Sequence, residues 1–467
     1  MTCLNHASLA ASLAALTVAA DAAAASKPKS PAGKRPAVIV IMTDQQTAGA
    51  ISCAGNPWVR TPAMDALAAD GVRFTRAYCP YPLSGPCRAA LVTGRMPFEV
   101  GAFDNAIRPA DADMQAGIGH RLAEAGYECL YAGKWHVPEV NLPDSGTGFR
   151  RISKMNDPAL ADACDAALKE YDGQKPLFLV ASLLNPHEIC EYGRHETLQY
   201  GELAPFSTEE CPNLPANFMP STYAAEALTL EHASSPRYHD TYTYTQDDWR
   251  RYLYAYYRLV ERADREVGRI VGVLKAHGLY DDAAIVFLSD HGDGAAAHGW
   301  NQKWNLQEEV INVPLIVKPP KGAGLRGVRN DEALSNVGLD LYATVCDYAG
   351  VTPDLERYRG RSLRPVAEGR QATLHDEVFV ETLLPGPDMR GWSVVGPRYK
   401  YVLYQWGRNR EALYDLQDDP GEMVNLAVDR RYEAELNRLR RAMYDWGVRI
   451  GDPKLVRNLR PFAETRN

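Results

Sequence analysis

The stretch Ala37-Val38-Ile39-Val40-Ile41-Met42 is a continuous apolar run, and the polar sequence Thr43-Asp44-Gln45-Gln46 follows it directly. Apolar runs without alternation are typical of a strand that is buried on both faces of a sheet. Similar runs occur downstream, and helical patterns lie between them. Alternating strands and helices predict an α/β fold with a mostly parallel central sheet that helices cover on both faces. The predicted strands are residues 37–42, 177–183, 283–288 and 313–317, and the predicted helices are residues 64–70, 119–125 and 249–277.

The pattern changes after about residue 374, where short apolar segments alternate with Gly and Pro turns. We expect short strands there and then a helix at residues 431–448. The sequence therefore predicts a large α/β domain over residues 37–373 and a smaller C-terminal antiparallel-sheet subdomain over residues 374–467. The strands expected in this subdomain are residues 378–382, 392–395, 399–404 and 412–416.

The N-terminal residues favour export of the chain. Residues 9–20 are apolar and small, and Ala-x-Ala sites follow them at residues 21–26. This pattern predicts a signal peptide over residues 1–25, too short to span a membrane, and a proline-rich polar linker over residues 26–36. We therefore expect a periplasmic or extracellular protein, with a disordered Ala-rich tail as the alternative. The formal net charge of −8 includes no basic block, which argues against nucleic acid as a partner.

The chain has 9 cysteines, and none of them form a C-x-x-C pair. A structural zinc site is therefore not expected. Because an exported protein can form disulfides, we expect a bond between Cys190 and Cys211, which flank one loop.

Two acidic residues follow predicted strands closely. Asp44 comes after the first strand, and Asp290 begins the sequence Asp290-His291-Gly292-Asp293 after another. In sheets of this kind ligands bind beyond the carboxyl ends of the strands. We expect Asp44 and Asp290 to lie at one edge of the sheet.

A third polar segment is Ser84-Gly85-Pro86-Cys87-Arg88, which an apolar run extends to Thr93-Gly94-Arg95. Ser84 can cap the N-terminus of a short helix, with Pro86 in the first turn and Gly94 at the end. The N-terminus of a helix carries unpaired N–H groups and partial positive charge, so it favours an anion near Ser84.

This segment resembles the sulfatase signature, Cys or Ser-x-Pro-x-Arg, in its serine form. A second hallmark of the family is present as Gly126-Tyr127-Glu128-Cys129-Leu130-Tyr131-Ala132-Gly133-Lys134-Trp135-His136, and the resemblance extends from about Val38 to about Leu426. The resemblance implies the alkaline-phosphatase-like superfamily, with residues 37–373 as the catalytic domain. It also implies that a serine-type maturing enzyme oxidises Ser84 to formylglycine.

Hydrolysis of a sulfate ester needs a nucleophile at sulfur, cations on the sulfonyl oxygens and an acid for the leaving alcohol. By resemblance, one hydroxyl of the formylglycine hydrate attacks sulfur and the other then expels sulfate. Arg88 would steady the hydrate, a task that suits its charged guanidinium group with its fixed fork geometry. Lys134 would contact both sulfate and formylglycine, and His136, two residues along, would be the base that helps the aldehyde to return.

Two further segments complete the implied active site. The sequence Asn185-Pro186-His187-Glu188 follows a buried strand, and His187 matches the family histidine that protonates the leaving alcohol. The sequence His298-Gly299-Trp300-Asn301-Gln302-Lys303 precedes Glu308-Glu309 and Val313-Pro314, an order that is common in sulfatases. Lys303 would bind the sulfate and the scissile oxygen, while His298 would touch the substrate or hold the loop.

The resemblance also implies a divalent cation. Its expected ligands are Asp44, Gln45, Ser84, Asp290 and His291. Many sulfatases carry Asp-Asp and Asp-Asn where this chain has Asp44-Gln45 and Asp290-His291. Ca²⁺ prefers oxygen ligands, and His291 departs from such a set. The resemblance still implies Ca²⁺, with Mn²⁺ as the alternative.

The sequence thus favours a secreted sulfatase that acts on sulfated carbohydrate such as glycosaminoglycan, mucin or algal glycan. The segment over residues 190–248, rich in Tyr and His, is expected to shape the substrate site. The first alternative is a phosphate or phosphonate ester hydrolase of the alkaline-phosphatase superfamily. A sulfated-glycan binding protein without activity is the second.

Overall fold

The computed structural model describes residues 35–137, 147–234, 241, 243–353 and 357–464. The predicted signal peptide and most of the predicted linker lie outside these residues. The described residues form one compact unit. Among the described residues, no helix is long and apolar enough to cross a membrane.

Strand β1 (Val38–Asp44) lies inside a sheet that has eight strands in the described ranges. It pairs in parallel with β6 (Leu177–Pro186) on one side and with β7 (Ala284–Ser289) on the other. Strand β8 (Leu315–Lys318) runs antiparallel to β7. The sheet is therefore mostly but not wholly parallel, which confirms the prediction. The order is β5-β4-β6-β1-β7-β8-β2-β9, where β2 is Val72–Phe74, β4 is Glu128–Gly133, β5 is Arg150–Ser153 and β9 is Val328–Asn330.

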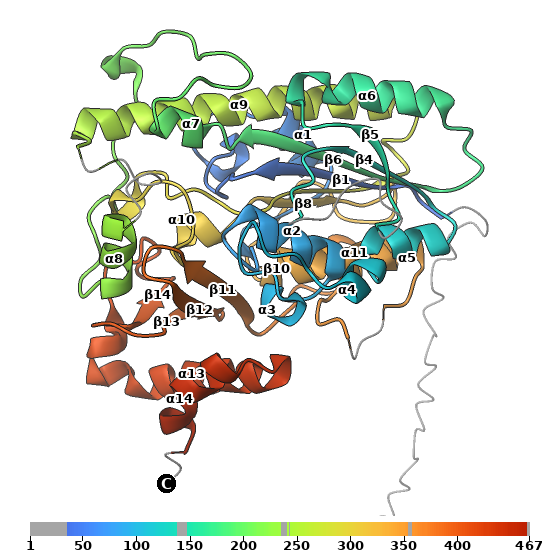
Figure 1. The fold of residues 1–467 in the computed structure, drawn as a ribbon. Helices are drawn as coiled ribbons and strands as arrows, with labels where there is room; N and C mark the ends of the chain where they lie inside the picture. Colours follow the sequence, from blue (N-terminus) through green and yellow to red (C-terminus); the bar gives the residue numbers. More distant parts are fainter. Residues whose placement is uncertain (1–34, 138–146, 235–240, 242, 354–356, 465–467) are drawn as a thin grey trace, which may run out of the picture. The chain divides into compact units, whose positions relative to one another are not determined.

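Alternate residues of β1 pack into two different cores, as a strand that is buried on both faces requires. Val38, Val40 and Met42 belong to one core, and Ile39 and Ile41 belong to the other. Figure 1 shows α6 and α9 on one side of the sheet and α2, α5 and α11 on the other. These helices are α2 (Ser84–Thr93), α5 (Ile118–Glu124), α6 (Asp157–Glu170), α9 (Gln246–Ala276) and α11 (Val337–Ala349).

The predicted helices are confirmed to within a few residues. They correspond to α1 (Pro62–Ala69), α5 and α9. Helix α9 begins three residues before the predicted start, because Thr245 and Asp248 form a capping box there. The Thr245 hydroxyl accepts a hydrogen bond from the Asp248 N–H, and the Asp248 carboxylate accepts one from the Thr245 N–H. The shorter helices are α3 (Pro97–Val100), α4 (Asp111–Gln115), α7 (Ile189–Gly193), α8 (Glu226–Ser234), α10 (Glu308–Ile311) and α12 (Arg364–Ala367).

The C-terminal part contains an antiparallel sheet, which has four strands among the described residues. One face, with Val380 and Val402, packs into the core around β1, and the other, with Trp392 and Leu403, packs against α13 (Glu433–Ile450). The sheet therefore lies between the core around β1 and two C-terminal helices (Figure 1). The elements are β11 (Val378–Leu384), β12 (Met389–Val395), β13 (Tyr399–Tyr404), β14 (Glu411–Asp415), α13 (Glu433–Ile450) and α14 (Pro453–Glu464), and a separate pair is formed by β3 (Ala77–Tyr78) and β10 (Ser335–Asn336).

Candidate active site

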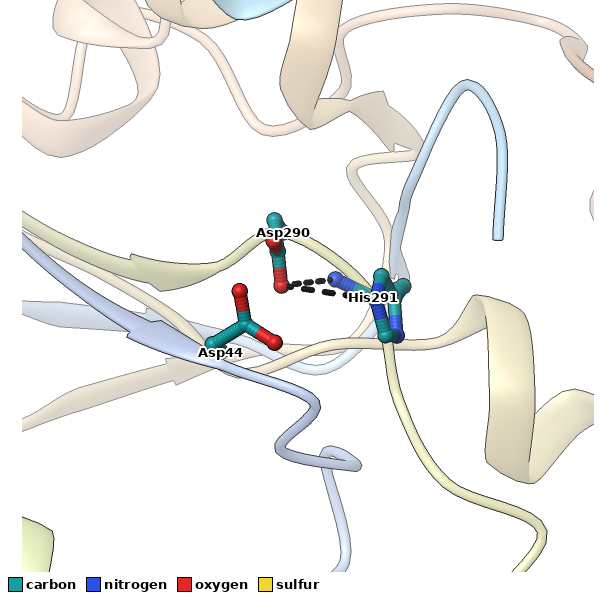
Figure 2. A group of neighbouring side chains, drawn as sticks. All are labelled: Asp44, Asp290 and His291. Atoms are coloured by element: carbon teal, nitrogen blue, oxygen red, sulfur yellow. Dashed lines mark hydrogen bonds and ion pairs between the residues drawn. The ribbon is translucent and has the colours of Figure 1, made fainter. Parts of the chain in front are cut away.

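The two strand-end carboxylates meet at one edge of the sheet, as predicted. Asp44 is the last residue of β1, and Asp290 follows β7. Thr43 pairs with Ser289 in the parallel register, so the next residue of each strand reaches the same place. Figure 2 shows the two carboxylates pointing toward each other with His291 beside them.

Ser84 reaches these carboxylates from the start of α2, where it is fully buried. The Ser84 hydroxyl lies 3.1 Å from Asp44 Oδ2 and 3.0 Å from His291 Nε2. The prediction that Ser84 caps the helix is wrong by one residue, because the extended residue Leu83 is the N-cap and Ser84 is the first helical residue. This shift leaves the Ser84 side chain free to turn away from the backbone and toward Asp44. Gly94 ends the helix with φ 66°, as expected.

Arg88, one turn further along α2, holds both carboxylates. Its Nε lies 2.9 Å from Asp290 Oδ2, and its Nη2 lies 2.8 Å from Asp44 Oδ2. Its Nη1 donates to the Lys134 carbonyl and to the Ser182 hydroxyl. Burial opposes the charge, but Asp290 and Asp44 outweigh it and raise the pKa of Arg88. A fully buried guanidinium with these partners stays charged and rigid.

Lys134 adds a second cation at Asp44, with its Nζ 2.7 Å from Asp44 Oδ2. A close approach of β4 to β6 places it there. Gly133, just before it, has φ 92°, and a Cβ at that position would lie 2.0 Å from the Ser182 carbonyl oxygen. Burial, and after it the nearby Arg88, lowers the pKa of Lys134. Lys303 lies at the same site, with its Nζ 2.8 Å from Gln45 Oε1.

Two predicted histidines face this positive cluster. Burial, with Lys134 and Arg88 nearby, lowers the pKa of His136 to about 3, so its imidazole is neutral at pH 7. Burial, with Lys134 and Lys303, also lowers the pKa of His187 well below its usual range. Both imidazoles therefore need an added negative charge nearby before they hold a second proton.

The residues Asp44, Asp290 and His291 fit a cation site. One ligand atom from each lies within 4.8 Å of the others, and all three side chains are buried. His291 Nδ1 lies 2.9 Å from the Gly292 carbonyl oxygen, which can only accept, so Nδ1 carries the proton and Nε2 keeps its lone pair. Burial lowers the pKa of His291, which keeps the ring neutral. Two carboxylates and a neutral imidazole suit a divalent cation.

The fourth expected ligand, Gln45, is oriented by a residue that the sequence reasoning did not select. Gln45 Nε2 donates to Asp293 Oδ2 at 2.8 Å, and Lys303 fixes the opposite end of the amide. Asp293 also accepts from the Tyr252 hydroxyl and from the N–H groups of Ala295 and Gln302. Burial raises the pKa of Asp293 to about 6, although these donors oppose the rise. Asp293 belongs to the motif at the strand end and could have been selected there. Nothing in the helical pattern around Tyr252 distinguishes it from a residue that only packs in the core.

The structure does not place His298 at the site, and it contradicts the expected disulfide. His298 donates its backbone N–H to the Asn217 carbonyl, and the charged groups near its ring are Lys400 and Asp419 rather than the cluster around Asp44. Its role in substrate binding stays a prediction. The expected disulfide is wrong, because Cys190 and Cys211 are free thiols. The Cys190 thiol lies under the site, 3.3 Å from Gln45 Oε1, while the Cys211 thiol contacts the Ser207 carbonyl.

A mostly parallel sheet with a helix-borne hydroxyl between Asp44 and His291, beyond the ends of the strands, defines a hydrolase with the alkaline-phosphatase-like fold. The family model described as "Sulfatase" matches residues 36–351, and that of the C-terminal part of N-sulphoglucosamine sulphohydrolase matches residues 296–448. The chain belongs to the sulfatase family and is a sulfuric ester hydrolase.

Known proteins resemble the chain over nearly its whole length. It is 29% identical to a Δ4,5-hexuronate-2-O-sulfatase of Bacteroides thetaiotaomicron, with 93% of each chain covered. The solved structure of a 2-O GAG sulfatase matches with a TM-score of 0.79 and 28% identity, covering 90% of this chain and 93% of that one. A phosphonate monoester hydrolase from Silicibacter pomeroyi matches with a TM-score of 0.73 and 22% identity over 90% of this chain and 96% of its own, which shows a shared fold.

Proposed function

We propose that this protein is an exported sulfatase that removes O-sulfate from carbohydrate, with formylglycine at position 84 as the nucleophile. The observation that carries the proposal is the position of the Ser84 hydroxyl, buried between Asp44 and His291 and beside the cations that Asp44 holds. A hydrated formylglycine supplies a nucleophilic oxygen and a route for the release of sulfate, which a plain serine hydroxyl lacks. A serine-type maturing enzyme would have to carry out the oxidation.

A divalent cation would be held by Asp44, Gln45, Asp290 and His291 together with residue 84. We propose Ca²⁺, with Mn²⁺ as the alternative, because oxygen ligands dominate the set and one imidazole joins them. Such a cation would lower the energy of the negative charge that gathers on the nucleophile and on the sulfate.

The charges around the site suit a sulfate ester. The ammonium groups of Lys134 and Lys303 lie where the sulfonyl oxygens would gain charge, each beside a group of the proposed cation site. The imidazole of His136 is neutral at pH 7, and it would accept a proton once negative charge gathers beside it during the reaction. A bound sulfate would offset the two ammonium charges that lower the pKa of His187, so the sulfated substrate itself would help His187 to carry the proton for the leaving alcohol.

A carbohydrate substrate is supported by the names of the similar proteins, which refer to hexuronate and to GAG. We propose glycosaminoglycan as the first class to test, before mucin and algal glycans. Lys134, His187, His298 and Lys303 are the proposed substrate-binding residues. Helix α8 and the other described residues of the segment 190–248 would line the pocket beyond the sulfate; residues 235–240 and 242 lie outside the described residues.

The test is sulfate release from defined sulfated mono- and disaccharides by protein that is produced with a serine-competent maturing enzyme. We expect activity, a loss of two hydrogens at residue 84 by mass spectrometry, and a fall of about a thousandfold or more for Ser84→Ala. Ser393→Ala is the matched control, since Ser393 is buried and its hydroxyl has no hydrogen-bond partner among the described residues. Full activity of Ser84→Ala would contradict the proposed nucleophile.

The same panel separates the alternatives. Comparing kcat/KM for matched sulfate and phosphonate esters distinguishes a sulfatase from a phosphonate hydrolase, whose fold the chain shares. Binding of sulfated sugar without turnover by oxidised protein would support a binding protein without activity.

A further inference from the structure

The residue Glu191 stands next to the proposed acid, His187, and has no role in the site described so far. His187 follows β6 directly, and Glu191 lies four residues on, within α7. Glu191 Oε2 lies 3.9 Å from His187 Nδ1. Both atoms are buried, and neither has a hydrogen-bond partner among the described residues. Two buried polar atoms that face each other without partners are uncommon in folded proteins and ask for an explanation.

The other carboxylate oxygen of Glu191 is held in place. Glu191 Oε1 lies 3.4 Å from a guanidinium nitrogen of Arg194, which also binds Glu196 on the surface. Since Arg194 fixes Oε1, the carboxyl group presents Oε2 to His187. Burial raises the pKa of Glu191, while Arg194 and Lys303 oppose the rise. The charged groups that face His187 from the other elements are Lys134, Lys303, Asp44 and His291.

We infer that Glu191 is a positioning residue for His187, an inference that rests on the proposed function. In this arrangement the imidazole turns its Nδ1–H to Glu191 Oε2, and the contact closes to hydrogen-bond length when substrate binds. The ring then directs Nε2–H at the leaving oxygen. The carboxylate also stabilises the doubly protonated ring against Lys134 and Lys303.

The step balances without another reactant. A deprotonated oxygen of the proposed formylglycine hydrate forms a bond to sulfur while the S–O bond of the ester breaks, and the electron pair of that S–O bond goes to the alcohol oxygen. The proton on Nε2 of His187 moves to that oxygen, and the imidazolium becomes a neutral imidazole. The Nδ1 proton stays between His187 and Glu191, so Glu191 itself never touches the substrate.

The experiment varies the leaving alcohol on one sugar scaffold. The substrates are a sulfated sugar that the wild type hydrolyses and the same sugar with fluorine on the carbon next to the sulfated one, which makes the alcohol more acidic. An acidic alcohol needs less help from a proton donor. We expect Glu191→Gln to lower kcat about tenfold or more on the first substrate and less on the fluorinated one, with KM within about twofold. Glu191→Ala should follow the same pattern more strongly.

Controls separate positioning from folding. Glu196→Gln changes the surface partner of Arg194 and should leave both substrates unaffected. In a His187→Gln background, Glu191→Gln should cause no further loss, because the two residues act as one unit. Equal losses on both substrates, or an unchanged effect in the His187→Gln background, would overturn the inference, and thermal unfolding of each variant identifies any that fail to fold. If the wild type releases no sulfate at all, the proposed function fails instead.

Discussion

The replacement of Asp293 by asparagine tests how Gln45, a proposed cation ligand, is oriented. The Asp293 carboxylate accepts from two donors at Oδ2, Gln45 Nε2 at 2.8 Å and the Gln302 N–H at 3.1 Å. It accepts the Ala295 N–H at Oδ1 at 2.8 Å, and the Tyr252 hydroxyl lies within 3.1 Å of both oxygens. An asparagine must place an NH₂ group at one of the two positions.

The two orientations of that asparagine differ in cost. With NH₂ at the Oδ2 position, two donors lose their acceptor. With NH₂ at the Oδ1 position, the Tyr252 hydroxyl can rotate to accept, and the Ala295 N–H alone is left unpaired. One buried donor without a partner costs about 1–3 kcal/mol, so we expect Asp293→Asn to lower the free energy of unfolding by about that amount. The oxygen stays at the Oδ2 position in this orientation, so the direction of Gln45 is kept.

Asp293→Leu removes both acceptors while keeping the branching of the side chain. Three N–H groups then lose their partner, so the loss should be at least about 3 kcal/mol. Urea unfolding, followed by tryptophan fluorescence in excess Ca²⁺, measures both variants. Asp281→Asn, at an exposed carboxylate that pairs with Lys321, is the control and should leave the free energy of unfolding nearly unchanged. If Asp293→Asn matched the wild type, or if the leucine variant were the milder one, this account of the hydrogen bonds would be refuted.

Three further predictions concern charge. Lys400 is fully buried and pairs with Glu308 and Glu422. Lys400→Met leaves these two carboxylates without their cation, so it should lower the free energy of unfolding by about 3–5 kcal/mol in urea or thermal unfolding. A smaller loss would mean that the two carboxyl groups are neutral. Removing divalent cations with a chelator should lower the melting temperature of the wild type, and Asp290→Asn should abolish that shift; an equal shift in both would place the cation elsewhere. Burial lowers the pKa of His298 from 6.5 to about 4. Because the unfolded chain binds the proton more readily, the stability that His298 contributes is present above pH 6.5 and is lost as the pH falls toward 4. The difference in unfolding free energy between the wild type and His298→Leu should therefore fall over this range, and a constant difference would contradict the shift.

The sequence predicted those features that depend on one element at a time. The apolar run of residues 37–42 identified a buried strand because both faces of β1 meet a core. The carboxyl ends of parallel strands share an edge, so the strand pattern alone was enough to place Asp44 and Asp290 together. The antiparallel course of β8 could not be predicted, because residues 315–318 read as a buried strand in either direction.

Side-chain contacts across the fold were beyond the reach of sequence patterns. The Cys190–Cys211 bond was predicted from spacing along one loop, but the Cys190 thiol turns under the site to Gln45 instead. The start of α2 was predicted one residue late, because the Ser84 side chain binds Asp44 rather than its own backbone.

From the sequence alone follow the α/β class, the sulfatase family and the residues gathered around Asp44, because these depend on local periodicity and on short motifs. The tertiary structure alone decided which donor faces which acceptor, such as Tyr252 on Asp293 and Glu191 beside His187. The reason is physical. Burial and charge act through space, so the partners of a buried polar group are chosen by packing between elements that can lie far apart in the chain.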